Sequence, residues 1–487
     1  MKPSKRAHAP IRTLTDALPA KTLTEGSSVR ADGGLPGLAS RRETDMPNCK
    51  PIVLAIVSTL CLCACATQTR LAEADRFGPD PKLPAPDSSL IPTINIAPAT
   101  GWPDGAMPIA AEGLTVSAFA RDLAHPRWLH VLPNGDVLVA ESDAPQREVQ
   151  AKGLRAWFMK RAMKKAGSGT PSADRISLLR DADHDGVAEL KTSFLTGLHS
   201  PFGMALVGGR LYVANADALL GFDYREGATS IEGRGEKVVD LPGGPINHHW
   251  TKSLLANREG TRLYVGVGSN SNIAENGMDN EVHRAAILEI DPIARTSRVF
   301  ASGLRNPVGM DWEPHSGRLW VVVNERDELG DDLVPDYLTS VQEGGFYGWP
   351  YSYWGRHVDE RVQPQRPELV AKALAPDYAL GAHTASLGLA FYQGGALPPR
   401  WRGGAFVGQH GSWNRSVPSG YQVVFVRFEN GRPVGLPEQV LGGFLDTQGN
   451  ARGRPVGVAI DSRGGLLVAD DVGNRVWRVG ASAASPR

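Results

Sequence analysis

Short runs in which apolar and polar residues alternate recur along most of the chain. Leu211 and Val213, and later Leu319, Val321 and Val323, fall on every second position, which is the spacing of one face of a β-strand. Turn-forming pairs separate such runs, at Asn134-Gly135, Gly208-Gly209, Ser316-Gly317 and Gly464-Gly465. The pattern predicts an all-β fold built from hairpins.

The hairpin unit is repeated six times. The units start near residues 126, 201, 249, 307, 386 and 455, and each opens with polar residues. Recurring all-β units of roughly 40–50 residues or more are typical of propeller blades, here with loop insertions. We therefore predict a six-bladed β-propeller. Seven blades are the alternative, if an insertion contains one more blade.

Composition supports a turn-rich globular domain and excludes one class of partner. The 487 residues include 55 Gly and 36 Pro, and 41% of all residues are hydrophobic, enough for a core. Lys and Arg together number 52, as do Asp and Glu, so there is no basic excess. We therefore expect no nucleic-acid partner.

Residues 46–64 have the pattern of a secretion signal. The apolar run 51–62 is too short for a membrane-spanning helix but suits the apolar region of a signal peptide. Leu62-Cys63-Ala64-Cys65 ends the run and resembles a bacterial lipobox. The resemblance implies that Cys65 is acylated and anchors the protein on the periplasmic side of a bacterial membrane. A plain secretory signal cleaved nearby is the alternative.

Three other segments lack strand periodicity. Residues 1–45 are interpreted as a disordered leader or a mis-assigned start, and residues 65–108 as a flexible tether before a propeller domain at 109–482. The basic segment Gln146–Ala166 has apolar residues at helical spacing. It predicts an inserted amphipathic helix that either touches a membrane surface or packs on the propeller.

One acidic segment has the spacing of a calcium loop. Asp181, Asp183 and Asp185 alternate and are followed by Gly186. The twelfth position is Thr192 where an EF-hand has Glu, so the loop is not a complete EF-hand. We predict a structural Ca²⁺ that braces an insertion, with a solvated acidic turn as the alternative.

The polar residues that open the repeats are the candidates for function, because propeller loops converge at one end of the central channel. They are His199, His248, His249, Arg305, Asn306, His383, Arg452 and Arg454. Several arginines in one place favour an anionic ligand with more than one carboxylate, since guanidinium and carboxylate pair through two hydrogen bonds.

Four stretches in this order resemble the pyrroloquinoline quinone (PQQ)-dependent soluble sugar dehydrogenases, and among them the sorbosone dehydrogenase branch. They are NHHWTKSL (247–254), GLRNPVGM (303–310), NERDELGDDLVPDYLTSVQEGGFYGWPY (324–351) and RGRPV (452–456). The similarity spans about residues 110–480. It implies a propeller enzyme that binds PQQ and Ca²⁺.

The resemblance also implies roles for the first two stretches. His249 would be the general base that removes the substrate hydroxyl proton, as Leu254 then falls in register, and His248 would lie beside the cofactor. The order of these two roles stays open. Arg305 and Asn306 would face the quinone carbonyls, where a fixed cation stabilises developing charge.

The later stretches would hold the rest of the cofactor. Arg452 and Arg454 would bind its carboxylates, and His410 or Arg415 would replace a lysine that the family has in that blade. The backbone carbonyls of Arg326 and Asp327 would bind Ca²⁺. Related enzymes have Gly-Pro where this chain has Arg326-Asp327, which puts the metal geometry in question.

The expected activity is oxidation of an aldose or a sorbosone-like sugar aldehyde at its first carbon, by His-assisted hydride transfer to the quinone. Electrons would then pass to a respiratory acceptor. The alternatives are a metal-dependent, lactonase-like propeller hydrolase and a non-catalytic propeller that binds the cell envelope.

Overall fold

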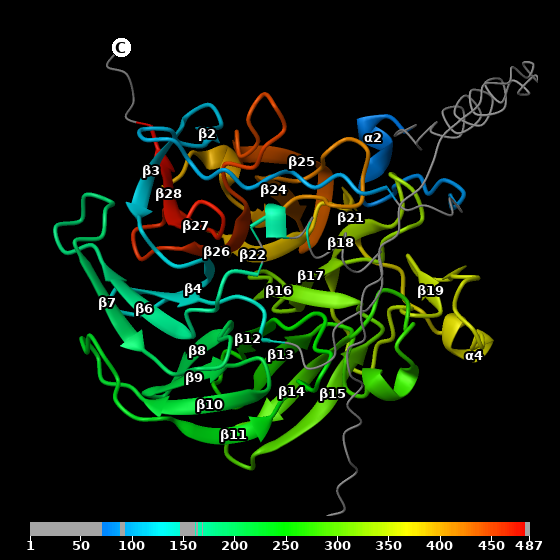
Figure 1. Cartoon of the computed structure of the whole chain (residues 1–487), viewed down its shortest axis with the longest axis horizontal. Helices are drawn as coiled ribbons and strands as arrows, with labels where there is room; N and C mark the ends of the chain where they lie inside the picture. The colour runs from blue at the N-terminus through cyan, green and yellow to red at the C-terminus, as the bar shows by residue number, and fades with distance from the viewer. Residues whose placement is uncertain (1–70, 88–92, 147–160, 162–163, 168, 483–487) are drawn as a thin grey trace, which may run out of the picture. The chain divides into compact units, whose positions relative to one another are not determined.

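A computed structural model of the chain describes residues 71–87, 93–146, 161, 164–167 and 169–482. Within these residues, six antiparallel sheets of four or five strands follow one another around a common centre, as Figure 1 shows. The prediction of an all-β, six-bladed propeller is confirmed. The predicted leader, signal peptide and lipidated Cys65 lie outside the described residues.

The first three blades are formed by consecutive strands. Blade 1 contains β4 (Pro126–Val131), β5 (Val137–Glu141), β6 (Arg175–Arg180) and β7 (Leu190–Leu195). Blade 2 contains β8 (Met204–Val207), β9 (Arg210–Ala214), β10 (Ala218–Asp223) and β11 (Glu236–Asp240). Blade 3 contains β12 (Lys252–Ala256), β13 (Leu263–Val267), β14 (Ala286–Asp291) and β15 (Thr296–Ser302).

The last three blades also take strands from the beginning of the chain. Blade 4 contains β16 (Asn306–Trp312), β17 (Leu319–Asn324), β18 (Pro335–Ser340), β21 (Tyr378–Ala382) and β1 (Phe77–Gly78). Blade 5 contains β22 (Ser386–Tyr392), β23 (Gly404–Gln409), β24 (Gln422–Glu429), β25 (Arg432–Gly442) and β2 (Ile109–Ala110). Blade 6 contains β26 (Pro455–Ile460), β27 (Leu466–Asp470), β28 (Arg475–Ala481) and β3 (Leu114–Ala120).

The remaining elements are short. They are the hairpin β19 (Ser352–Tyr353) and β20 (His357–Val358), the helical turns α2 (Glu73–Arg76) and α4 (Pro367–Val370), and the 3-10 turns η1 (Met278–Glu281) and η2 (Pro399–Trp401). Most of the helix expected at Gln146–Ala166 lies outside the described residues. In the described part of the chain, no helix is both long enough and apolar enough to cross a membrane.

The ring is closed by pairing between the two ends of the domain. β3 pairs antiparallel with β28, so that Leu114 lies opposite Ala481 and Ala120 opposite Val476. Blade 6 therefore obtains its outermost strand from the start of the domain. This pairing gives β28 a hydrogen-bonded neighbour in place of a free edge.

The core lies between neighbouring blades. Six large clusters of buried apolar side chains lie between adjacent sheets, and the one between blades 6 and 1 joins Leu467 and Val476 to Val137 and Val139. The cluster between blades 1 and 2 also extends to the innermost strands of blades 4, 5 and 6. Both faces of a blade are covered in this way, which explains why β17 has five buried residues in a row.

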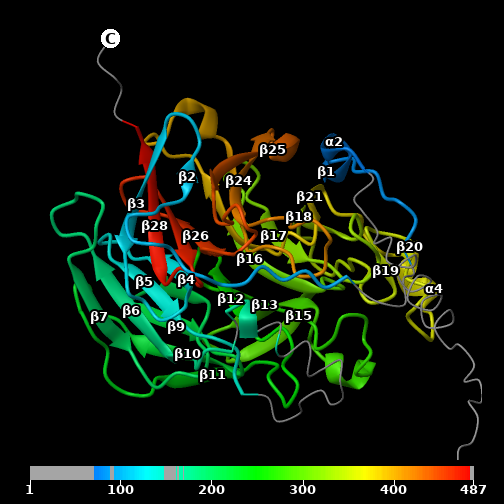
Figure 2. The ribbon, with the colours of Figure 1, turned by 45° about the horizontal axis from the view of Figure 1, so that its top comes forward.

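The segment expected to be a flexible tether is a packed part of the domain over its described residues, 71–87 and 93–108. β1 adds a fifth strand to blade 4, and Figure 2 shows the segment before β2 running across the blades. Ala99 bridges to Ala451, and Trp102 is buried. Backbone pairing and burial of a large aromatic ring explain the difference from the expectation.

We predict that Trp102→Ala destabilises the whole propeller. The Trp102 ring packs on Phe444 and Trp477, and its indole N–H donates to Asp470 Oδ2 over 2.6 Å. Loss of a buried Trp lowers the free energy of unfolding by about 3–5 kcal/mol, measurable by denaturant titration. The exposed neighbour Asp104→Ala is the control. Parent-like unfolding of the Trp102 variant would restore the tether interpretation.

Candidate functional site

The innermost strand of each blade begins at the end of the sheet where the second strand stops. Lys252 pairs with Val267, Asn306 with Asn324, and Pro455 with Asp470. The loops before the innermost strands therefore meet the loops that follow the second strands. We call this end of the propeller the mouth, and most of the predicted site residues lie there.

His249 lies in the loop before β12 and is held in one orientation. Its Nδ1 lies 2.8 Å from the carbonyl oxygen of Ser269 and 3.1 Å from the Ser269 hydroxyl. Because a carbonyl can only accept, Nδ1 carries the proton and Nε2 is left with a free lone pair. The imidazole of His249 can therefore accept a proton at Nε2.

Burial is the main reason that the pKa of His249 lies well below its usual value of 6.5. The neighbouring His248, Arg305 and Arg284 lower the pKa further through their positive charge. His248 itself is exposed, and its ring meets that of His249 edge-on, with 4.7 Å between the ring centroids. His249 is consequently neutral at neutral pH.

Gly268 brings His249 and Asn306 together. A Cβ atom on Gly268 would lie 2.2 Å from Asn306 Oδ1 and 2.5 Å from His249 Cβ. Asn306 is buried, yet its Oδ1 accepts no hydrogen bond from any described residue. A buried amide oxygen without a hydrogen-bond donor, near a free imidazole nitrogen, is suited to a polar ligand.

Arg305 is fixed by a network of polar partners. Its guanidinium donates to the carbonyl of Glu325 over 2.6 Å, to Asn272 Oδ1 over 2.9 Å and to Asp327 Oδ2 over 3.1 Å. The Asp327 carboxylate balances the charge of Arg305. The predicted cationic group is present at the mouth, but it is paired.

Asp327 and His383 form a second ion pair beside Arg305. His383 Nδ1 lies 3.2 Å from Asp327 Oδ1, and its Nε2 lies 2.9 Å from the carbonyl of Gly330. Burial acts to lower the pKa of His383, but the bond to Asp327 outweighs it and the pKa is raised. Burial acts to raise the pKa of Asp327, but His383 and Arg305 hold it below its usual value.

In the loop predicted to bind Ca²⁺, Arg326 and Asp327 have different partners. Arg326 is fully buried and donates to Asp359 Oδ2 over 2.7 Å, in the insertion after β18. The carbonyl of Asp327 accepts from the Asn272 amide over 3.2 Å. One of the two predicted carbonyl ligands therefore has a protein partner.

Arg454 and Arg452 differ in their surroundings. Arg454 is buried, donates to the carbonyls of His410 and Ala97, and stacks over Tyr421 with 4.8 Å to the ring centroid. It has no carboxylate partner among the described residues, and its Nε has no hydrogen bond there. Arg452 is half-buried, and its charge acts on Asp446.

His410 belongs to a cluster around Asp471. His410 Nε2 lies 2.8 Å from Asp471 Oδ2, and Arg127 of β4 donates to the same oxygen. Burial lowers the pKa of His410 to about 4. Arg127 also lies over the ring of Trp250, 5.8 Å from its centroid, which links this cluster to the segment that carries His249.

Arg415 takes part in the site indirectly. It donates to the carbonyl of Asp331 over 3.0 Å and to that of Val417 over 3.0 Å, and it pairs with Asp332. These contacts brace the loop that follows Asp327. Arg415 therefore supports the loop, while His410 occupies the mouth.

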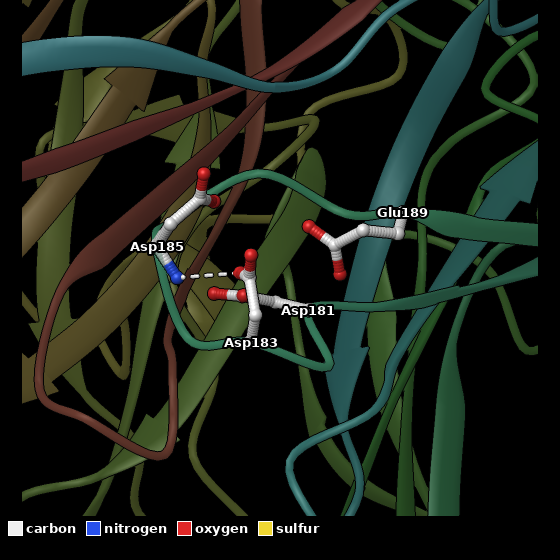
Figure 3. A group of neighbouring side chains, drawn as sticks. All are labelled: Asp181, Asp183, Asp185 and Glu189. Carbon is white, nitrogen blue, oxygen red and sulfur yellow. Dashed lines mark hydrogen bonds between the residues drawn. The ribbon is translucent and has the colours of Figure 1, made fainter.

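The acidic side chains of the predicted calcium loop lie close together, in the hairpin between β6 and β7. Asp181, Asp183, Asp185 and Glu189 each offer a carboxylate oxygen within 4.8 Å of the others, and Figure 3 shows all four around one turn. Asp181 Oδ1 is buried without a hydrogen-bond partner among the described residues, and Arg463 lies 3.6 Å from Asp181 Oδ2. Glu189 is a member that the sequence pattern did not single out.

Several residues that shape the mouth carry no sequence signal of their own. Ser269, Asn272 and Arg284 lie in the loop between β13 and β14, and Asp471 follows β27. Ser269 and Asn272 belong to LYVGVGSNSN (263–272), which follows the His249 stretch and also resembles the sugar dehydrogenases, but neither residue was singled out there as a site residue. For Arg284 and Asp471, only the position of their loops after the second strands, at the end of the sheet where the innermost strands begin, could have indicated a role.

Comparison with known families identifies two matching regions. The family described as "Glucose / Sorbosone dehydrogenase" matches residues 225–414. The family described as "TrAA12-like" matches residues 367–482. The two matches overlap and together span residues 225–482, from before β11 to the end of β28.

Two curated relatives match parts of this chain. An uncharacterized protein of Borreliella burgdorferi is 30% identical over 241 residues, 49% of this chain and 62% of that protein. The aldose sugar dehydrogenase YliI of Escherichia coli is 31% identical over 113 residues, 23% of this chain and 29% of that protein. The chain thus spans less than two thirds of either relative.

A fungal relative also has a solved structure. The PQQ-dependent pyranose dehydrogenase of Coprinopsis cinerea is 25% identical over 270 residues, 45% of this chain and 35% of that protein. The holo form of its PQQ domain superposes with a TM-score of 0.61 at 20% identity, covering 79% of this chain and all of that chain. This likeness shows a shared fold.

We predict that Gly268→Ala disturbs His249 and Asn306 together. The new Cβ would overlap both side chains, and such overpacking costs about 1–3 kcal/mol of unfolding free energy. NMR of ¹⁵N-labelled histidine should show that the His249 Nδ1–H is no longer protected by Ser269. Gly395→Ala, at an exposed site with room for a Cβ, is the control. An unchanged His249 signal would refute the close packing at Gly268.

Proposed function

Because the chain belongs to the PQQ-dependent soluble sugar dehydrogenase family, we propose that it oxidises an aldose or a sorbosone-like sugar aldehyde at its first carbon. PQQ is the proposed cofactor, a small sugar the substrate, and a respiratory carrier the electron acceptor. The residues at the mouth support this proposal from both sides of the expected cofactor.

The observation that carries the proposal is the state of Arg454. A buried guanidinium without a carboxylate partner is costly unless a ligand supplies the anion. PQQ has three carboxylates, and the Tyr421 ring keeps the guanidinium plane fixed to receive one of them. Arg452, two residues earlier and half-exposed, is proposed as a second carboxylate ligand.

The opposite side of the mouth fits the quinone end of the cofactor. Asn306 offers an amide oxygen with no hydrogen-bond partner among the described residues, and His249 offers a free Nε2. Arg305 supplies a rigid cation next to both. When bound, PQQ would supply a two-electron acceptor for the hydride of the substrate's first carbon.

His249 is the proposed general base. Its Nε2 accepts the proton of the substrate hydroxyl, and a hydrated or cyclic sugar aldehyde offers the same group. The Ser269 carbonyl holds the ring orientation during the transfer, because it keeps the proton on Nδ1. Because the pKa of His249 is lowered, its Nε2 stays unprotonated, and so able to accept a proton, at pH values below 6.5.

Two calcium sites are proposed. The Arg326–Asp327 loop would hold Ca²⁺ through backbone carbonyls, and the Asn272 amide would have to leave the Asp327 carbonyl for both to serve. The group of Asp181, Asp183, Asp185 and Glu189 would hold a structural ion. The second site is proposed to brace the hairpin between β6 and β7.

A periplasmic location with a lipid on Cys65 is also part of the proposal, and it is supported by the lipobox-like sequence alone. A lactonase-like hydrolase finds less support. Among the described residues, the one group of three or more His, Cys, Asp or Glu with the spacing for a metal is the Asp181 group. It lies outside the mouth, where a hydrolytic metal would be needed.

We predict that the full chain binds PQQ and that Arg454→Gln weakens the binding. Loss of a charge-assisted bond of about 1.5–3 kcal/mol corresponds to a roughly 10- to 150-fold increase in Kd. Absorbance titration and the melting temperature, each with and without Ca²⁺, would measure it. Sugar-dependent dye reduction by the loaded protein should follow.

Arg210→Gln is the matched control, since Arg210 pairs with Asp223 and Glu236 at the surface of blade 2. It should bind PQQ like the parent. The proposal fails if the folded parent binds no PQQ, or if a broad panel of aldoses and sugar aldehydes gives no dye reduction.

We predict that Ca²⁺ raises the melting temperature of the chain through the Asp181 group. Four carboxylates in close proximity repel one another without a cation, so Asp183→Asn should stabilise the protein in EDTA and remove most of the Ca²⁺-induced gain. The exposed Asp223→Asn is the control. A calcium-induced shift that Asp183→Asn leaves intact would place the ion elsewhere, and no shift at all would favour a solvated turn.

A further inference from the structure

Arg284 is a buried cation behind His249 that the proposed chemistry does not yet use. It precedes β14, is 6% exposed, and forms no ion pair within hydrogen-bonding distance among the described residues. Burial lowers its pKa to about 10, against the influence of nearby Glu281. A charged group in such a place needs all of its hydrogen bonds satisfied.

Four of the five hydrogen bonds that Arg284 donates go to backbone carbonyls around the base. Nε donates to the carbonyl of Gly268 over 3.0 Å, and Nη1 donates to the carbonyls of Pro242 and Gly243 over 2.7 and 3.3 Å. Gly268 immediately precedes Ser269, whose carbonyl orients His249. Arg284 therefore holds the strand end that carries the orienting group.

The other donor group reaches the segment of the base itself. Nη2 donates to the carbonyl of His249 over 2.9 Å and to Asn247 Oδ1 over 3.1 Å. Asn247 has a positive φ of 36°, a backbone conformation that Asn adopts more readily than most residues. The fully buried Lys252 lies 3.4 Å from the same Asn247 oxygen. One guanidinium thus joins both ends of the loop between β11 and β12 to the residue that follows β13.

The charges around the base are mainly positive. His248 faces His249 from its own segment, Arg305 from the loop before β16, and Arg284 from the loop before β14. Glu281 faces Arg284, and Glu275 faces His248. Arg284 consequently acts on the imidazole in two ways, by fixing its backbone and by adding to the positive field.

We propose that Arg284 is the positioning residue of the base, a guanidinium clamp that holds His249 and the Ser269 carbonyl in register. This inference rests on the proposed function for its role in catalysis. Its structural part, the fixed orientation of the His249 ring, holds with or without a cofactor.

The test compares Arg284→Gln with the parent by ¹⁵N NMR of the histidine rings in the full chain, without added cofactor. His249→Gln assigns the His249 signals. In the parent, His249 should be the Nδ1–H form and should titrate well below pH 6.5. In Arg284→Gln, both tautomers should appear, and the titration midpoint should move upward by about half a unit, since a nearby cation is lost.

Steady-state turnover of the PQQ-loaded protein provides the second measurement. Misplacement of the base by Arg284→Gln should lower kcat by about 10- to 100-fold with little change in KM. Arg284→Lys, which keeps a cation but offers three donors in place of five, should fall between the parent and the Gln variant.

Two further variants make the result decisive. Asn247→Asp keeps the acceptor for Arg284 and adds a negative charge, so it should raise the His249 midpoint while the Nδ1–H form persists. Arg180→Gln breaks an ion pair with Asp136, away from the mouth, and should leave the His249 signals unchanged. If Arg284→Gln does not fold, the tautomer, the titration midpoint and kcat of Arg284→Lys are compared with those of the parent instead.

The proposal is overturned if folded Arg284 variants retain the parent tautomer, titration and kcat. A parent that shows no sugar turnover contradicts the proposed function instead, and the NMR comparison still decides the role of Arg284.

Discussion

The shared direction of the six innermost strands is the constraint on which the site depends. Each strand begins at the same end of its sheet, so residues as far apart in the sequence as Arg127 and Asp471, 344 positions, meet at one mouth. His249 precedes β12, Asn306 begins β16, His383 precedes β22 and Arg454 precedes β26. The apolar clusters between blades hold these strands in place, and the packing of the core therefore determines the geometry of the polar groups.

The mouth combines the neutral imidazole of His249 with three buried guanidinium groups that differ in their hydrogen-bond and ion-pair partners. Arg305 is balanced by Asp327, and Arg284 is satisfied by carbonyls, but Arg454 has no anionic partner among the described residues. An anionic ligand is thus favoured on the Arg454 side, and proton acceptance on the His249 side. This separation of roles is what a redox cofactor with carboxylates and a substrate hydroxyl would require.

Local signals in the sequence were sufficient for the blades but not for the network between them. The starting points of all six innermost strands fall within three residues of those expected, because strand alternation and turn glycines are local features. The packing of residues 71–87 and 93–108 and the pairing of β3 with β28 are contacts between distant segments. Arg326 illustrates the same limit, since its turn toward Asp359 depends on an insertion whose fold has no repeat pattern.

A crystal structure of the full chain grown with PQQ and Ca²⁺ tests the central claim most directly. The account predicts electron density for PQQ at the mouth, with a carboxylate on the Arg454 guanidinium, the quinone oxygens near Asn306 and Arg305, and His249 Nε2 facing the adjoining space. Density for PQQ at another surface, or a mouth that stays without it while the protein is saturated in solution, would contradict the account.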